Sequence, residues 1–176
     1  DYFGMQAFFT QLQYKPSKAG EMLLTSGSPV TKHPRTGESI NAYALGTDMP
    51  EQSPEGDRRL ILAEWMTSPE NPWFAKNVAN RTWAHFLGRG IIEPVDDVRM
   101  TNPPTNPALL DSLAAHFVDS EFDFRQLVKT ILMSATYQRS PDVNPTNQRD
   151  EQNYSRYLFK QLEAEVLLDA ISQVTG

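Results

Sequence analysis

The sequence predicts a mainly α-helical fold: about five helices in an irregular bundle, with a loop-rich N-terminal third that has room for a small β element. Three observations lead to this prediction. Beyond residue 56, apolar residues recur at helical offsets of three and four. Residues that cap helices stand just before those runs. Residues 21–55 are instead rich in Gly, Pro, Ser and Thr, which is typical of loops.

The first third of the chain differs in texture from the rest. Residues 2–12 place apolar side chains at near-helical spacing, and a polar turn follows them, so one helix is predicted there. Residues 21–55 contain short apolar runs between turn residues, which suits loops with one or two short strands. We therefore assign residues 1–55 to an N-terminal helix plus a loop-rich segment, and residues 56–176 to a helical domain.

Two helices are predicted in the middle of the chain. Asp57 is a suitable N-cap for a short helix that ends before Pro69. Pro72 suits the first turn of the next helix, over residues 73–87, and Gly88 ends that helix. Both predictions rest on residues that typically begin or end helices as well as on the spacing of apolar residues.

A long loop and three more helices complete the predicted domain. Residues 91–107 contain four prolines, so we expect an extended, ordered loop. Asn106 and Asp123 are suitable caps for two helices with apolar stripes. A last helix is predicted over residues 155–174. Short connections between these helices favour antiparallel packing.

Composition and charge exclude several classes of function. The formal net charge of -6 gives no basic surface for a polyphosphate backbone, so no nucleic-acid partner is expected. The absence of cysteine excludes disulfides, thiolate metal sites and thioether-linked haem. There is no run of roughly 20 apolar residues, so no membrane span is expected. Both ends look like cuts, and we expect the chain to be a fragment of a longer protein.

A cluster of polar residues on and after helix 73–87 is the candidate functional site. Its members are Asn80, Arg81, His85, Arg89, Asp96, Asp97 and Arg99. On a functional interpretation they line a pocket between helix 73–87 and loop 91–107, in a hydrolytic or redox enzyme domain whose arginines hold a carboxylate or sulfate. On a structural interpretation, Arg81 and Arg89 pair with Asp96 and Asp97 and hold the loop to the helix.

The structural interpretation is favoured, because a long loop needs anchoring and its buried polar groups need partners. Asp96 and Asp97 are adjacent, so in an extended segment their carboxylates point to opposite sides and do not form a catalytic pair. No catalytic residue is assigned.

No metal and no cofactor are predicted. The three histidines, His33, His85 and His116, lack the spacing of a zinc site. A noncovalent haem held by His85 and by Met66 or Met100 stays open as a weaker alternative. Tryptophan and phenylalanine side chains can stack on sugars, but their helical spacing favours a place in the core.

Six short blocks, in this order along the chain, resemble one known family. They are NRTWAHFLGRG (80–90), PVDDVR (94–99), NPP (102–104), PALL (107–110), SATY (134–137) and LEAEVLLDA (162–170). Together they are similar to the planctomycete-type domain of unknown function 1553 family, over about residues 57–176. Several ordered blocks are more specific than a single motif.

The resemblance implies a context rather than a chemistry. Proteins of this family are large, exported and often carry a cytochrome-c-like domain, so the implied partners are neighbouring domains of the same chain and the implied location is the periplasm or the cell surface. No catalytic residue can be carried over. We therefore expect a noncatalytic structural or interaction module of a larger exported multidomain protein, with a link to electron transfer or polysaccharide degradation. The enzyme domain described above is the alternative.

Overall fold

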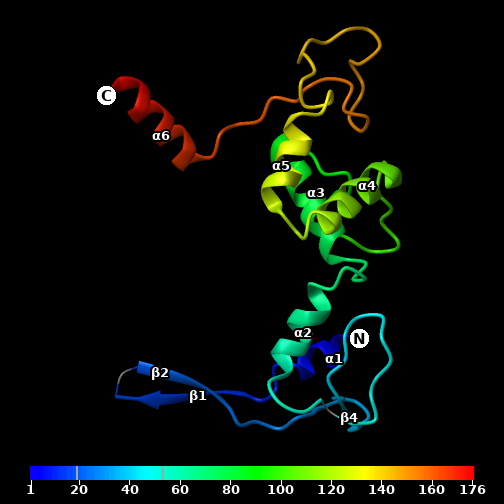
Figure 1. Ribbon diagram of the computed structural model, residues 1–176, viewed down its shortest axis with the longest axis vertical. Coiled ribbons are helices and arrows are strands. Elements are labelled where there is room, and N and C mark those ends of the chain that lie inside the picture. The colour runs from blue at the N-terminus through cyan, green and yellow to red at the C-terminus, as the bar shows by residue number, and fades with distance from the viewer. Residues whose placement is uncertain (19, 53) are drawn as a thin grey trace. The chain divides into compact units, whose positions relative to one another are not determined.

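The computed structural model describes residues 1–18, 20–52 and 54–176. Within these ranges the chain forms six helices and four short strands, in the order α1, β1 to β4, α2 to α6 (Figure 1). The described chain is thus largely helical with a small β element in its N-terminal part, as the sequence predicts. It divides into two compact units, Asp1–Asn71 and Pro72–Gly176.

The first unit begins with α1 (Tyr2–Ala7) and two antiparallel strand pairs. These are β1 (Leu12–Ser17) with β2 (Gly20–Thr25), and β3 (Thr31–Lys32) with β4 (Ser39–Ile40). The helix predicted over residues 2–12 therefore ends early, because Leu12 pairs with Thr25 in the hairpin. Apolar spacing did not reveal this, since the partner strand lies further along the chain.

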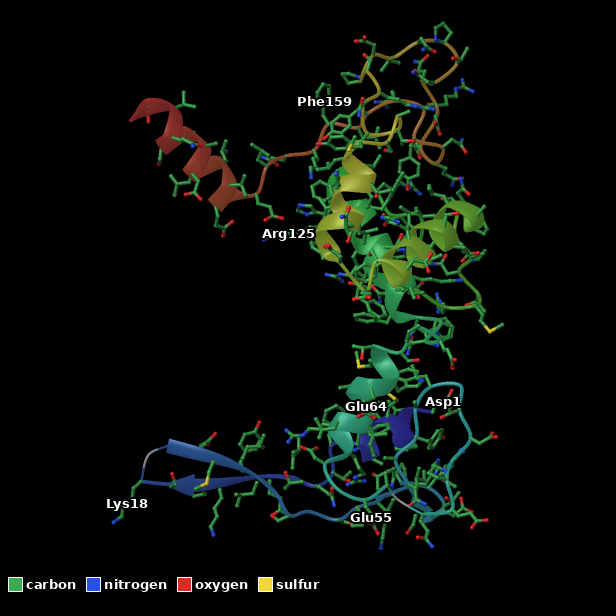
Figure 2. The ribbon with its side chains drawn as sticks, in the orientation of Figure 1. Asp1, Lys18, Glu55, Glu64, Arg125 and Phe159 are labelled. Atoms are coloured by element: carbon green, nitrogen blue, oxygen red, sulfur yellow. The ribbon has the colours of Figure 1, made fainter. Side chains whose placement is uncertain are left out.

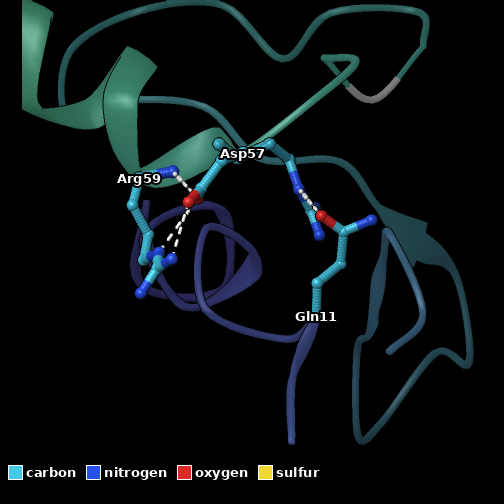
Figure 3. Close-up of polar contacts among 4 residues, drawn as sticks. Gln11, Asp57 and Arg59 are labelled. Atoms are coloured by element: carbon cyan, nitrogen blue, oxygen red, sulfur yellow. Dashed lines mark hydrogen bonds and ion pairs between the residues drawn. The ribbon is translucent and has the colours of Figure 1, made fainter. Parts of the chain in front are cut away.

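α2 (Arg58–Met66) completes the core of the first unit. The Asp57 carboxylate accepts a hydrogen bond from the backbone N–H of Arg59, as an N-cap does, and pairs with the Arg59 guanidinium at 2.6 Å (Figure 3). The buried apolar residues of this core are Ala7, Phe8, Ala42 and Leu62. Because α2 packs on residues of the first third, the unit extends to Asn71, whereas the composition changes near residue 55.

Arg58 is a buried cation in this core, with only 1% of its surface exposed. Its guanidinium donates to the carbonyl oxygen of Pro29 and, at 3.2 Å, to the side-chain oxygen of Gln11, which is labelled in Figure 3. Burial lowers the pKa of Arg58. The bonds join α2 to two loops of the first unit, because a buried donor must find acceptors.

Three helices of the second unit pack on one another: α3 (Phe74–Leu87), α4 (Pro107–Asp119) and α5 (Phe124–Leu132). Their buried residues follow helical spacing, as the stripe on α4 shows with Leu110, Leu113, Ala114 and Phe117. Trp83 on α3 is 2% exposed and lies in the same core. The three helices therefore share one apolar core.

The ends of these helices follow the predicted signals. The side chains of Asn106 and Asp123 accept backbone N–H groups at the starts of α4 and α5. Gly88 ends α3 with φ 80°, in the left-handed region that favours glycine. These ends set where the loop after α3 leaves the helix and where it returns.

The last helix, α6 (Ala164–Thr175), begins later than residue 155. The segment before it is held by tertiary bonds: the Tyr154 hydroxyl donates to the Gly90 carbonyl at 2.7 Å, and the Tyr157 N–H donates to the Ser140 carbonyl at 3.1 Å. Because these contacts hold the backbone in another conformation, the segment does not form the predicted first turns of the helix. Among the helices of the described ranges, α6 included, none combines the length and the apolarity needed to cross a membrane.

Candidate functional site

Asn80, the first member of the predicted cluster, lies in the middle of α3 and is fully buried. Its Nδ2 donates to the carbonyl oxygens of Ile92 at 3.1 Å and Val95 at 3.0 Å. Its Oδ1 accepts the N–H of Ile92 at 2.9 Å. One side chain thus satisfies three backbone groups of the following loop, which could otherwise not be buried without a large free-energy cost. Asn80 is a brace for the loop.

The loop is held by further bonds on both sides of this brace. Gly90 packs so closely that an added Cβ would lie 2.4 Å from the Ile92 carbonyl oxygen. The Tyr154 hydroxyl donates to the carbonyl of Gly90, and burial raises the pKa of this phenol. Asn102 Nδ2 donates to the Glu93 carbonyl at 3.0 Å. The segment is therefore an ordered loop, as its prolines predict.

The charged members of the cluster pair close to the surface. Arg81 forms an ion pair with Asp96, and their side chains are 60% and 72% exposed. Asp97 pairs with Arg99 at 2.9 Å. The Nε of Arg89 is buried and has no hydrogen-bond partner among the described residues. The structure therefore pairs Arg81 with Asp96, as the structural interpretation expects, whereas Asp97 takes Arg99 as its partner instead of Arg89.

His85 lies at the exposed edge of α3. Its ring stands edge-on to Phe86 with the centroids 4.9 Å apart, and its backbone carbonyl accepts a hydrogen bond from Lys160. Met100, weighed as a haem ligand, is 91% exposed. Over residues 1–18, 20–52 and 54–176, no three His, Asp or Glu side chains lie close enough together to hold a metal ion.

An open apolar surface lies between α3 and α5, which pack side by side (Figure 1). Two adjoining hollows of about 450 and 610 Å³ share Phe86 and Phe124 in their linings. We call them together the α3–α5 groove. Its apolar floor consists of Val78, Phe86, Phe124, Val128 and Leu132. On α5 these residues recur every four positions, beside the stripe of Leu127 and Ile131 that faces the core.

The rim of the groove is basic. Arg125, labelled in Figure 2, and Lys129 lie on α5, while Arg81 and His85 lie on α3. The positive charge of Arg81 is paired with the carboxylate of Asp96. Arg125 and Lys129 have no carboxylate within ion-pair distance among the described residues, so they leave the rim with a positive charge. The groove therefore suits a ligand that is apolar on one side and acidic beside it.

A smaller hollow of about 210 Å³ lies where Trp83 meets the end of the long loop and Tyr154. None of the seven predicted site residues lines it. Arg81 and His85 instead line the α3–α5 groove, so the structure brings two of the seven to an open surface.

Residues 58–176 match the model of the family described as PSD1, protein of unknown function (DUF1553). The chain belongs to this family. No curated protein and no solved structure matches it. The DUF1553 region contains α2 to α6, all seven predicted site residues and the whole α3–α5 groove.

Neither the α3–α5 groove nor the role of Tyr154 was predicted from the sequence of this DUF1553 chain. A signal for the groove was present: Phe124, Val128 and Leu132 form a second apolar stripe beside Leu127 and Ile131. An apolar surface wider than one neighbour can cover indicates a second contact. Tyr154 had no local signal, because its partners Gly90 and Trp83 lie far away along the chain.

Proposed function

We propose that the unit Pro72–Gly176 is a noncatalytic structural and interaction module of a larger exported multidomain protein. Its α3–α5 groove would hold an acidic amphipathic helix of that protein. The observation that carries the proposal is that two faces of α3 have different roles. On one face, Asn80 makes all its hydrogen bonds to the loop backbone. The neighbouring face lines a groove with an apolar floor and a basic rim.

The pairing of the polar cluster argues against the enzyme alternative. A catalytic group must reach a substrate, and a general acid or base needs a pKa that suits its task. The Asn80 amide is hydrogen-bonded to the loop backbone, and the carboxylates of Asp96 and Asp97 form ion pairs with arginines. Using Asn80 on a substrate would first require breaking the hydrogen bonds that order the loop, and Asp96 and Asp97 are already paired with arginines.

The wider context of the proposal comes from the resemblance of the six sequence blocks. On this resemblance we propose that the module works in the periplasm or at the cell surface, with neighbouring domains, a cytochrome-c-like domain among them, as partners. A link to electron transfer or polysaccharide degradation would then belong to those neighbours. In that setting the module positions other domains and performs no reaction of its own.

A titration with a model helix tests the groove. The probe is a synthetic peptide of about four turns with leucines on one face and glutamates on the other, and its control carries lysines in place of the glutamates. We expect the chain to bind the glutamate peptide more tightly, because rim charges select partners by sign. In the double variant Arg125→Glu, Lys129→Glu, binding of the glutamate peptide should weaken about tenfold. Equal binding of both peptides, or no binding by a chain whose groove holds no other helix, would refute the proposal.

A further inference from the structure

α6 is an amphipathic helix whose apolar stripe packs on no other helix or strand of the described residues. Only Val166, which lies off that stripe, lines a hollow of about 180 Å³ beside His85. None of its residues is buried, although its apolar side chains are large: Leu168 is 64% exposed, Ile171 51% and Val174 87%. Isolated helices of about 12 residues are marginal in water, and most helices in proteins are stabilised by packing of the apolar face. A helix of this composition therefore needs a surface to cover it.

The two faces of α6 differ in charge as well as polarity. Ala164, Leu167, Leu168, Ile171 and Val174 follow one another at offsets of three, one, three and three, which makes a single stripe. Glu165 and Asp169, four residues apart, run along one edge of that stripe. Residues 161–176 contain no lysine or arginine. The helix thus presents an apolar face with an acidic edge.

The α3–α5 groove has the complementary character. The apolar stripe of α5 from Phe124 to Leu132 is about 12 Å long and that of α6 from Ala164 to Val174 about 15 Å, at a rise of about 1.5 Å per residue. Beside the floor, Arg125 and Lys129 repeat at an offset of four, as Glu165 and Asp169 do on α6. The acidic edge of the helix therefore matches the basic rim of the groove.

In the structure α6 does not lie in the groove of its own chain, and the segment before it is bound beside that groove. Lys160 donates to the His85 carbonyl and lies over the Phe86 ring at 5.6 Å, which anchors the chain at one end of α3. Only Gln161, Leu162 and Glu163 separate this anchor from α6. None of them is a glycine, proline or asparagine of the kind that reverses a chain sharply. No residue of α6 lines the groove.

We propose that α6 of one copy lies in the α3–α5 groove of a second copy, and that the two copies exchange their helices reciprocally. This proposal rests on the proposed function, because it names the occupant of the same groove. A reciprocal exchange uses the contact twice under one two-fold axis and needs no change in the anchored segment. Both surfaces that one copy leaves open are then covered.

Light scattering after size exclusion gives the first test. The native chain should show twice the 19.9 kDa mass of one copy. Leu168→Glu places a charge on the apolar stripe and should give a single copy, without affecting the core, since α6 has no buried residue. Gln173→Glu adds the same charge on the opposite face and should leave the dimer intact. A native chain with the mass of one copy at all concentrations would overturn the proposal.

Charge exchange between copies tests reciprocity. One variant carries Arg125→Glu and Lys129→Glu, and the other carries Glu165→Lys and Asp169→Lys. Each alone sets like charges against each other and should weaken self-association about tenfold. Their mixture should restore the dimer, because both grooves then face helices of opposite charge. Failure of the mixture to associate would contradict the exchange.

An engineered disulfide separates a second copy from the same copy. The chain has no cysteine, so the pair Val128→Cys, Leu168→Cys, which joins the middles of the two stripes, gives an unambiguous cross-link. A cross-linked dimer on a denaturing gel supports the exchange, and a cross-linked single chain would overturn it. Val128→Cys with Gln173→Cys on the far face is the control, which should stay unlinked.

The peptide titration, repeated on Leu168→Glu, distinguishes the two proposals. If the variant binds the glutamate peptide but the native chain is a single copy, the groove is a helix-binding site and α6 of a second copy is not its occupant. If the variant binds no peptide, the proposed function fails as well.

Discussion

Asn80 and Ile92 exchange two hydrogen bonds, with the Asn80 amide donating to the Ile92 carbonyl at 3.1 Å and accepting the Ile92 N–H at 2.9 Å. A side chain thereby does for one residue of the loop what a neighbouring strand does in an antiparallel sheet. Both residues are buried, so water cannot replace either bond. The order of the loop after α3 depends on this pair.

Replacing Asn80 by alanine should destabilise the chain by about 3 kcal/mol, because it leaves the N–H and C=O of Ile92 and the C=O of Val95 buried without their partner. Asn80→Asp should be no better, since it sets carboxylate oxygens against two carbonyl oxygens. Urea unfolding of both variants measures the loss. A loss below about 1 kcal/mol for Asn80→Ala would show that water replaces the Asn80 amide as the hydrogen-bond partner of Ile92 and Val95.

Gly90→Ala should cost more stability than Gly88→Ala, although both glycines lie beside the same helix end. A Cβ at Gly90 would lie 2.4 Å from the Ile92 carbonyl oxygen, a backbone atom that cannot move aside alone. At Gly88 the nearest atom is 3.9 Å away, so the cost is the left-handed φ of 80°, about 1 kcal/mol. We expect Gly90→Ala to lose at least about 2 kcal/mol. Thermal unfolding of the two variants measures the stability that each loses, and equal losses would contradict the close packing at Gly90.

Arg81→Ala and Asp96→Asn should each change the unfolding free energy by less than about 1 kcal/mol, because their ion pair is solvent-exposed. Chemical unfolding at low and high salt is the measurement. The small loss should shrink further at high salt, where exposed pairs are screened. A loss as large as that of Asn80→Ala would instead mean that the ion pair orders the loop.

The contribution of Asp150 to stability should disappear in acid. Hydrogen bonds from Ser155 and from the backbone N–H groups of Asn153 and Gln152 hold the pKa of Asp150 well below its usual range. A depressed folded-state pKa gives stability that is present above the unfolded value of about 3.9 and is lost as the pH falls below it.

Asp150→Asn should therefore lower the unfolding free energy by roughly 1 kcal/mol at pH 7. The difference from the native chain should narrow between about pH 5 and pH 2. Glu151→Gln, one residue further along, is the control for removing a negative charge from this loop. A difference between native chain and Asp150→Asn that stays constant with pH would contradict the assignment.

The sequence predicted the helices best where their ends carry chemical signals. Asp57, Asn106 and Asp123 cap helices as expected, and Gly88 ends α3. Capping bonds join residues two or three positions apart, so the local sequence contains all the information they need. The first and last helices have no comparable side-chain caps, and there the predicted bounds were too long.

The sequence predicted the members of the candidate cluster and the Arg81–Asp96 pair, but not the partners of Asp97 and Arg89. The structure pairs Arg81 with Asp96 and turns His85 toward the groove, whereas Asp97 pairs with Arg99 and Arg89 lies partly buried. The sequence spacing does not indicate which arginine pairs with which aspartate, since all of these residues lie on α3 or in the loop that follows it. The choice depends on which atoms the folded loop brings within hydrogen-bond distance.

The sequence by itself determined the helical class, the helix ends with caps, the ordered loop after α3 and the family to which the chain belongs. The helix ends come from interactions between residues close in sequence, the loop was predicted from its own prolines, and the family from six blocks in a fixed order. The tertiary structure alone decided that Asn80 braces Ile92, that Tyr154 holds Gly90 and that the second stripe of α5 stays open. Their energies depend on contacts between distant segments, which form only when the core of α3, α4 and α5 has packed.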